Sequence, residues 1–147
     1  MQNPMNDAIW QHIENSMAAQ TMMQTLGARL AHVGDGEATI EAPILPGSRQ
    51  QQGAGAGALT FALGDTAAGY AALSKLSLDY EVLTSELKIN FLAPAVGELL
   101  RAEGKVVKAG RRQIIVTAEV YAITGEERQL IAVLQGTMVP TTAARSY

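Results

Sequence analysis

Residues 50–72 read QQQGAGAGALTFALGDTAAGYAA, and this stretch decides the expected architecture of the chain. From about residue 57 to residue 75 nearly every position is apolar, so a helix formed there is apolar on every face. Such a helix must be buried on every face, which in a small domain requires a sheet wrapped around it. We therefore predict a long central helix at about 57–75.

The segments on either side supply the rest of the expected fold. An N-terminal helix is predicted at about 6–24, and Gly27 ends the helical region. Alternating apolar and polar residues separated by Gly and Pro turns predict strands at 28–34, 37–44, 82–92, 98–107, 112–123 and 129–139. The prediction is one α+β domain over residues 1–147, with an antiparallel sheet of about five to six strands around the central helix.

Composition excludes several functions. The 147 residues carry a net charge of -3 without a basic block, which argues against nucleic-acid partners and against an electrostatic membrane anchor. The chain has no cysteine, so disulfides and thiolate nucleophiles are excluded. The first residues show no signal-peptide pattern, and a cytoplasmic protein is expected. His12 and His32 are isolated, so no metal site is predicted.

Asp65 is the residue of the central helix that needs a chemical explanation. It is the only acid between residues 57 and 75, and the nearby Ala68, Gly69 and Ala72 are small enough to leave room for a ligand. A buried carboxylate must find partners or have its pKa raised by desolvation, and both situations are typical of acids that act as a base or nucleophile. The alternative is a purely structural acid bonded to a backbone amide or to a partner chain.

The glycine-rich segment 53–57 leads into the start of this helix. The first amides of a helix have no internal acceptor, and small residues allow a ligand carbonyl to approach them closely. The segment therefore offers an oxyanion donor, although a flexible helix entry is the alternative. A nucleotide-binding loop is disfavoured because the Gly-Lys-Ser/Thr ending and the parallel βαβ context are missing.

Two stretches resemble a known family. The segment 50–72 is similar to the pattern Asn/Gln-x-x-Gly-x-x-His-Gly-Gly followed by Leu-x-Asp-x-Ala, which is found in hotdog-fold acyl-CoA thioesterases of the phenylacetate-degradation (PaaI-like) type. The positions in register are Gln50, Gly53, Gly57, Leu63, Asp65 and Ala67. The second stretch, 83–112, resembles the family's strand with a Phe/Tyr-Leu-x-Pro ending and a later Gly-Arg turn. Together the likeness covers about residues 25–140.

This resemblance implies a mechanism. Asp65 would be the general base or nucleophile of thioester hydrolysis, and the Gly57 amide would be the oxyanion donor. Gln50 would orient the water or the thioester, and Thr84 would support the water. The family's active site is shared across a homodimer, which pairs further into a tetramer. No cofactor is implied, since coenzyme A belongs to the acyl-CoA substrate.

The resemblance also shows a departure, and residue size and charge suggest which residues bind the substrate. Ala56 stands where the family carries His. The residues expected to line the substrate are Ala56, Ala58, Ala68 and Gly69, and those expected to bind the coenzyme phosphates are Lys108, Arg111 and Arg112. A solvated hairpin tip is the alternative for the three cations. The alternative functions are a non-catalytic acyl-CoA-binding module, favoured by Ala56, and a hotdog dehydratase, which would need a His near the acid.

Overall fold

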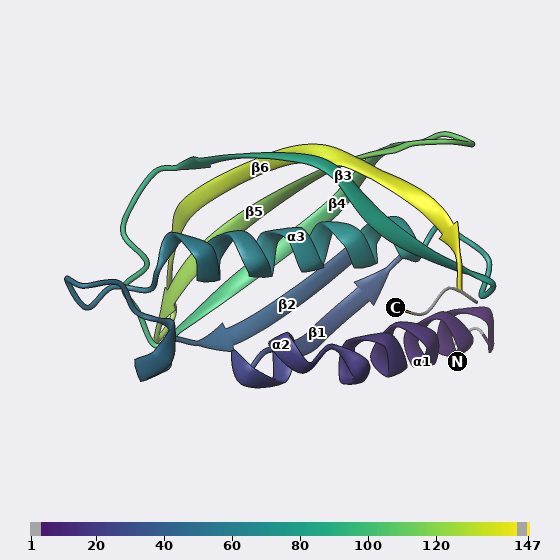
Figure 1. Cartoon of the computed structure of the whole chain (residues 1–147). Helices are drawn as coiled ribbons and strands as arrows, with labels where there is room; N and C mark the ends of the chain where they lie inside the picture. Colours follow the sequence, from purple (N-terminus) through teal and green to yellow (C-terminus); the bar gives the residue numbers. More distant parts are fainter. Residues whose placement is uncertain (1–3, 144–146) are drawn as a thin grey trace.

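The computed structural model describes residues 4–143 and 147, which form helices packed on one antiparallel sheet (Figure 1). The helices are α1 (Pro4–Ala19), α2 (Thr21–Thr25) and α3 (Gly57–Leu73), with a short 3-10 turn, η1 (Pro46–Ser48). The strands are β1 (Arg29–Gly34), β2 (Glu37–Pro43), β3 (Tyr80–Phe91), β4 (Leu99–Ala109), β5 (Ile114–Thr124) and β6 (Glu127–Thr142). The predicted α+β architecture is confirmed.

The sheet has the order β1-β2-β4-β5-β6-β3, and every neighbouring pair is antiparallel. It curves around α3, which lies in its concave side (Figure 1). The order leaves β1 and β3 as the two edge strands, and β3 is 12 residues long. The part of the site described below lies between α3 and this β3 edge.

Contact between α3 and the sheet depends on small residues on both sides. The helix residues Leu63, Ala67 and Ala71 are fully buried. A Cβ added to Gly104 of β4 would lie 2.3 Å from the carbonyl oxygen of Ala67. Only glycine allows the helix backbone to approach the strand this closely.

Burial of α3 is less complete than the sequence predicted. Its C-terminal half is enclosed, but Gly57 and Ala58 are exposed, and Phe61, Asp65 and Gly69 are only half-buried. These positions recur at helical spacing and form one stripe, the open face of α3. The prediction of burial on every face is therefore wrong for this stripe in one chain, because β3 ends the sheet beside it.

The N-terminal helix is divided in two. A helix over about 6–24 was predicted, and the structure divides it, because Gln20 has extended backbone angles and separates α1 from α2. The break directs Met23 into the core, where it is 2% exposed, while Ile13 and Met17 of α1 are also buried. Helix α3 stops at Leu73 rather than at 75 because the Ser74 hydroxyl donates to the carbonyl oxygen of Ala71 (2.6 Å) and accepts the Gly36 amide (2.8 Å).

Within the described residues, no helix has both the length and the apolar character that crossing a membrane requires.

Candidate active site

Asp65 lies on the open face of α3, where it meets β3. The Thr84 hydroxyl donates a hydrogen bond to Asp65 Oδ1 at 2.6 Å. The sulfur of Met138 lies 3.4 Å from the same hydroxyl oxygen, but the carboxylate is the stronger acceptor. Asp65 therefore has the partner that the sequence predicted, and this partner is the Thr84 side chain rather than a backbone amide.

A bulge in β3 sets the position of Thr84. The pairing of β3 with β6 shifts register between Thr84 and Glu86, so Ser85 is an extra residue. Val82 and Thr84 then face the helix before the bulge, and Leu87 and Ile89 pack on the core after it. Bulges are common beside active sites because they redirect a side chain in this way.

The cleft beside Asp65 has a volume of about 260 Å³ and is bounded by α1, α3 and β3. Its lining residues are Ser16, Gln20, Asp65, Thr66, Gly69, Tyr70, Glu81, Val82, Leu83 and Thr84. Gly69 lines it as predicted. Ala68 and Ala72 are fully buried and do not line it, so their predicted contribution of ligand space is wrong. Both are 0% exposed, so packing covers them and leaves no ligand space beside them.

Sequence reasoning missed the polar end of this cleft. Gln20 Nε2 donates to the Tyr70 hydroxyl at 2.6 Å, and Ser16 Oγ lies 3.1 Å from the same oxygen. Burial raises the pKa of Tyr70, whose side chain is only 4% exposed, and the nearby Glu81 carboxylate acts in the same direction. Ser16 and Gln20 are four residues apart beside the apolar stripe of α1, and this spacing is the signal that identifies their shared face.

The start of α3 presents free amides. Ala56 is the N-cap but has no side-chain oxygen, so it makes no capping hydrogen bond. The Ala56 carbonyl oxygen accepts hydrogen bonds from the amides of Leu59 and Thr60. The amides of Gly57 and Ala58 have no acceptor among residues 4–143 and 147. Gly57 and Ala58 are exposed, so both amides are accessible to a ligand oxygen.

The loop before α3 is held rigidly. The Ala56 amide donates to the Ser48 carbonyl (2.8 Å) and the Gly55 amide to the Ala95 carbonyl (2.8 Å). Gln50 is bonded within this loop, where its Oε1 accepts the Gln52 amide and its Nε2 lies 3.4 Å from Gln52 Oε1. Gln50 therefore does not line the Asp65 cleft of its own chain.

One chain does not bring the predicted catalytic groups together. Gly57 and Asp65 are eight residues apart on a straight helix, which separates them by about 12 Å along the axis at 1.5 Å per residue. A thioester carbonyl bound at Gly57 is therefore out of reach of water activated by Asp65 of the same chain. The structure pairs Asp65 with Thr84 near the middle of α3, while Gly57 lies at the helix start and Gln50 in the loop before it.

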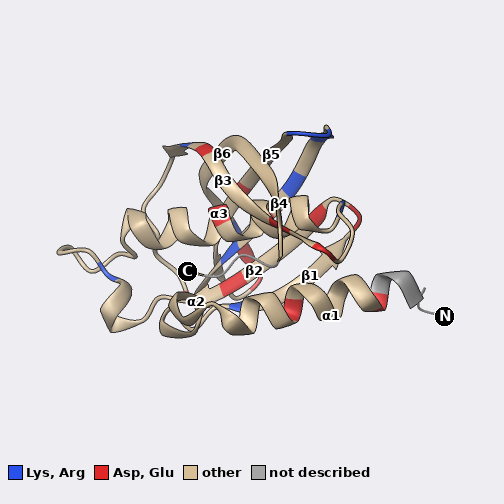
Figure 2. Cartoon of the chain, turned by 45° about the vertical axis from the view of Figure 1, so that its right-hand side comes forward, with Lys and Arg blue, Asp and Glu red and all other residues tan. Residues whose placement is uncertain are grey.

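The three predicted phosphate ligands lie at the end of the sheet that also carries Thr84. Thr84 of β3 pairs with Met138 of β6, and Met138 pairs with Ile114 of β5. Ile114 in turn pairs with Ala109, the last residue of β4, so the β4–β5 hairpin begins level with Thr84 across the sheet. Lys108, Arg111 and Arg112 are exposed on this hairpin, which is the blue tip in Figure 2. The hairpin is remote from the glycine-rich loop of its own chain (Figures 1 and 2).

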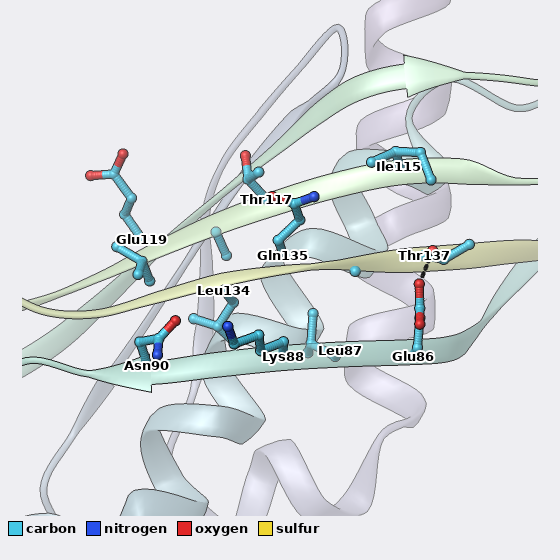
Figure 3. Close-up of a pocket in the computed structure, with 13 residues that line it drawn as sticks. Glu86, Leu87, Lys88, Asn90, Ile115, Thr117, Glu119, Leu134, Gln135 and Thr137 are labelled. Atoms are coloured by element: carbon cyan, nitrogen blue, oxygen red, sulfur yellow. Dashed lines mark hydrogen bonds between the residues drawn. The ribbon is translucent and has the colours of Figure 1, made fainter.

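A second hollow, of about 790 Å³, lies on the outer face of the sheet (Figure 3). It is lined by side chains of β3, β5 and β6 that include Glu86, Lys88 and Glu119, and Thr137 donates to Glu86 Oε1 at 2.9 Å. The sheet separates this hollow from α3 and Asp65. Although this hollow is larger than the Asp65 cleft, it is not the candidate active site, because none of the groups identified above lines it.

The histidines lie outside the Asp65 cleft. His12 Nε2 is 3.3 Å from the carbonyl oxygen of Tyr80, and His32 Nε2 is 3.8 Å from Glu37. The described residues contain no cluster of three or more His, Cys, Asp or Glu arranged to hold a metal ion. A dehydratase that pairs His with the acid is disfavoured, because no histidine lines the cleft.

Comparison with known proteins identifies the family. The family model of the thioesterase superfamily matches residues 53–128, which include α3, β3, β4 and β5. The chain belongs to the thioesterase superfamily. This membership supports thioester hydrolysis in general, while the acyl group and the catalytic residues are not established by it.

Several solved structures have the same architecture. A thioesterase family protein from Silicibacter pomeroyi is 35% identical, with a TM-score of 0.88 over 92% of this chain and 99% of that chain. A conserved protein from Pseudomonas aeruginosa is 29% identical, with a TM-score of 0.77 over 86% and 98%. No curated protein matches the chain.

The predicted likeness to PaaI is seen in the fold. The PaaI protein of the Escherichia coli phenylacetic acid degradation operon has a TM-score of 0.81 over 90% of this chain and 93% of that chain. At 20% identity, that comparison shows the shared fold alone. The expected hotdog architecture is confirmed, and the family model confirms that the chain is a thioesterase superfamily member.

Proposed function

We propose that this thioesterase superfamily member hydrolyses the thioester of an acyl-coenzyme A, with Asp65 as general base or nucleophile. The observation that carries this proposal is the hydrogen bond from Thr84 to Asp65 at the cleft between α3 and β3. The bond fixes the carboxylate in one orientation and leaves its second oxygen for water or substrate. Positioned carboxylates of this kind serve as bases or as nucleophiles.

The oxyanion donor in this proposal is the Gly57 amide of a second chain. Its own chain supplies no acceptor among residues 4–143 and 147, and about 12 Å of helix separates it from its own Asp65. A homodimer with shared sites resolves this separation, because it brings the helix start of one subunit to the cleft of the other. Two such sites form by symmetry, one at each cleft.

The β3 edge supports this assembly. It carries exposed apolar side chains, with Leu83 48% and Phe91 55% exposed, and long open edges tend to be paired or covered. Helix α3 runs antiparallel to β3, with Gly57 beside Phe91 and Asp65 beside Thr84. An antiparallel β3–β3 pairing centred near Leu87 therefore brings Gly57 of the partner subunit toward Asp65. A tetramer formed from two such dimers is the further assembly that we expect.

In the reaction, the thioester oxygen accepts a hydrogen bond from the Gly57 amide of the partner subunit. Asp65 removes a proton from water while the water oxygen bonds to the carbonyl carbon, or its carboxylate attacks that carbon directly. The carbon–sulfur bond then breaks, and the proton passes to the thiolate to give coenzyme A and the free acid. In the direct route, water hydrolyses the resulting anhydride. Gln50 of the partner subunit orients the thioester.

The substrate surfaces follow from the same geometry. Ala56 and Ala58 flank the Gly57 amide without a bulky side chain, and Gly69 leaves room in the cleft. Lys108, Arg111 and Arg112 extend from the Thr84 end of the sheet, where they bind the coenzyme phosphates in this proposal. No cofactor takes part, and the protein acts in the cytoplasm.

A non-catalytic acyl-CoA-binding module is the second candidate function. The alanine at position 56, where PaaI-like relatives carry His, favours it. Binding and turnover separate the two functions. An enzyme releases free thiol from acyl-CoA, whereas a module binds acyl-CoA tightly without releasing thiol.

The test combines two variants in one assay of thiol release. Asp65→Asn removes the base, and Gly57→Pro removes the oxyanion donor. Each alone is expected to lose activity by about 10²-fold or more. After mixed refolding, a dimer that contains both chains has one intact site, so the mixture is expected to recover up to about a quarter of wild-type activity. Full activity of Asp65→Asn contradicts the proposed mechanism, and absence of recovery contradicts the shared site.

A further inference from the structure

The cleft beside Asp65 ends in a polar cluster that the hydrolysis itself does not use. Its members are Ser16 at the end of α1, Gln20 between α1 and α2, and Tyr70 on α3. The Tyr70 oxygen is 2.6 Å from Gln20 Nε2 and 3.1 Å from Ser16 Oγ. Ser16 and Gln20 are half-buried, so the cluster is partly desolvated yet borders the cleft. The following inference rests on the proposed thioester hydrolysis.

Counting hydrogens shows what the cluster offers to a ligand. Gln20 donates to Tyr70, and one hydroxyl hydrogen is used between Tyr70 and Ser16. The hydrogen of the other hydroxyl has no acceptor among the described residues, and Gln20 Oε1 accepts no hydrogen bond from them. The second Nε2 hydrogen of Gln20 is also free of an acceptor among the described residues, so the cluster has two donors and the Gln20 Oε1 acceptor to spare. An alcohol or a carbonyl on the ligand matches this set, whereas a saturated hydrocarbon leaves these groups unpaired.

Charge in the cleft restricts the ligand further. Asp65 and Glu81 both line it, and neither Lys nor Arg is among its lining residues. An anionic group entering this cleft meets two carboxylates and no cation, which is unfavourable in a partly desolvated space. The anionic coenzyme is therefore excluded from the cleft, so the acyl group is the part of the substrate that occupies it.

The size of the cleft is the third restriction on the acyl group. A volume of about 260 Å³, lined mainly by polar residues, accommodates a short acyl group and lacks the apolar wall that a long hydrocarbon chain needs. Val82, Leu83 and Gly69 are its apolar members.

We propose that Ser16, Gln20 and Tyr70 are specificity residues that select short, uncharged acyl groups carrying a hydroxyl or carbonyl. Glu81 rejects acyl groups that end in a carboxylate. The selection acts at the end of the cleft remote from Thr84, through residues of the N-terminal segment that lies outside the matched residues 53–128.

The experiment compares kcat/KM for three acyl-CoAs of the same carbon number, measured by release of free thiol. The three are butyryl-CoA, 3-hydroxybutyryl-CoA and succinyl-CoA. Wild type is expected to prefer the hydroxylated substrate and to use succinyl-CoA least. In Gln20→Leu, the preference for 3-hydroxybutyryl-CoA over butyryl-CoA is expected to fall about five- to tenfold, the loss of one neutral hydrogen bond.

Matched controls distinguish a change in substrate selection from a general disturbance of how the N-terminal helix packs. Gln11→Leu makes the same change on α1 at an exposed position that does not line the cleft, and its substrate ratio is expected to stay at the wild-type value. If Gln20→Leu does not fold, Tyr70→Phe removes the central hydroxyl while keeping the ring, and it is expected to lower the same ratio. Because a ratio of two substrates is measured, general loss of activity does not imitate the effect.

Glu81→Gln tests whether the Glu81 charge rejects acyl groups that end in a carboxylate. It is expected to raise kcat/KM for succinyl-CoA several-fold relative to butyryl-CoA, while Glu126→Gln in the exposed β5–β6 turn leaves the ratio unchanged. Unchanged ratios in Gln20→Leu, Tyr70→Phe and Glu81→Gln, with thiol release intact, overturn the specificity assignment alone. Absence of thiol release from every substrate, or equal release by Asp65→Asn, overturns the proposed function together with it.

Discussion

The face of α3 that rests on the sheet and its open face are both rich in small residues, yet their surroundings differ. On the sheet face, Ala67 lies so close to β4 that only Gly104 fits opposite it. On the open face, Gly57 and Gly69 border exposed or half-open space, and a Cβ added to Gly69 would lie 3.7 Å from Val82. Small residues therefore allow close packing on one face and leave ligand space on the other.

This comparison has a functional consequence. Substitutions on the sheet face are expected to change the free energy of unfolding, and substitutions on the open face are expected to change turnover. The predictions below use changes that alter one property and keep the other constant.

The largest effect is expected at the start of the open face. Gly57→Pro removes the N–H while keeping helical geometry, since Pro suits the first helical position and Ala56 already has the extended angles (φ -64°, ψ 149°) that precede Pro. We expect kcat to fall about 10²- to 10³-fold, the cost of one oxyanion donor. Thermal unfolding should change little.

Gly57→Ala is the control for this change. It adds a methyl group near the exposed ring of Phe91, where the added Cβ would lie 3.2 Å from Cζ, but it keeps the amide hydrogen. Activity close to wild type is expected, because the Phe91 ring can turn aside. Equal losses in the Ala and Pro variants would show that shape rather than the amide matters.

The next effect is expected on the sheet face. In Gly104→Ala, the new Cβ would lie 2.3 Å from the Ala67 carbonyl oxygen, so helix and strand must separate. We expect the free energy of unfolding to fall by about 3 kcal/mol, the upper range for overpacking. Gly69→Ala is the matched change on the open face, and it should leave stability unchanged or raise it by about 0.5 to 1 kcal/mol. Chemical denaturation measures both, and similar losses in the two variants would erase the contrast between the faces.

A smaller effect is expected at Thr84. Thr84→Val keeps the shape of the side chain but removes the hydrogen bond to Asp65. We expect kcat to fall about tenfold, because one hydrogen bond to a charged group contributes about 1.5 kcal/mol or more. Thr84→Ser retains the hydroxyl and should keep most of the activity. A Val variant as active as wild type would remove Thr84 from the site.

The smallest effect is expected in the pH dependence of stability. Burial, assisted by the Glu81 charge, raises the pKa of Tyr70 above its ordinary value of 10.0. The folded state therefore binds a proton that the unfolded state has lost, and stability falls as pH rises above about 10. Denaturation between pH 9 and about pH 11 should show a smaller decline for Tyr70→Phe than for wild type. Parallel curves for the two proteins would contradict this assignment.

Much of the fold was predictable from local pattern. The apolar run after Gly57 identified the central helix, and period-2 alternation identified the strands, since both signals depend on near neighbours in the chain. The position of the break at Gln20 was not predicted, and neither was the hydrogen bond from its side chain to the distant Tyr70 hydroxyl. The incomplete burial of α3 was also missed, because the sequence does not state which strand lies at the sheet edge.

The candidate site divides in the same way. The Asp65 and Gly57 motif positions were available from the sequence, and so was the resemblance that suggested Thr84. The hydrogen bond between Thr84 and Asp65 depends on the Ser85 bulge and on the position of β3 beside α3. Ala68 and Ala72 were wrongly expected to provide ligand space, because residue size does not show which small residues are covered by distant segments.

The sequence by itself therefore determined the helix of small residues, the lone acid within it and the glycine-rich start with free amides. These are consequences of side-chain size, charge and missing capping groups, which are properties of single residues and their neighbours. Only the tertiary structure decided that Asp65 bonds to Thr84 and that Gln20 and Ser16 border the same cleft through Tyr70. Those relations depend on packing between segments that are distant along the chain.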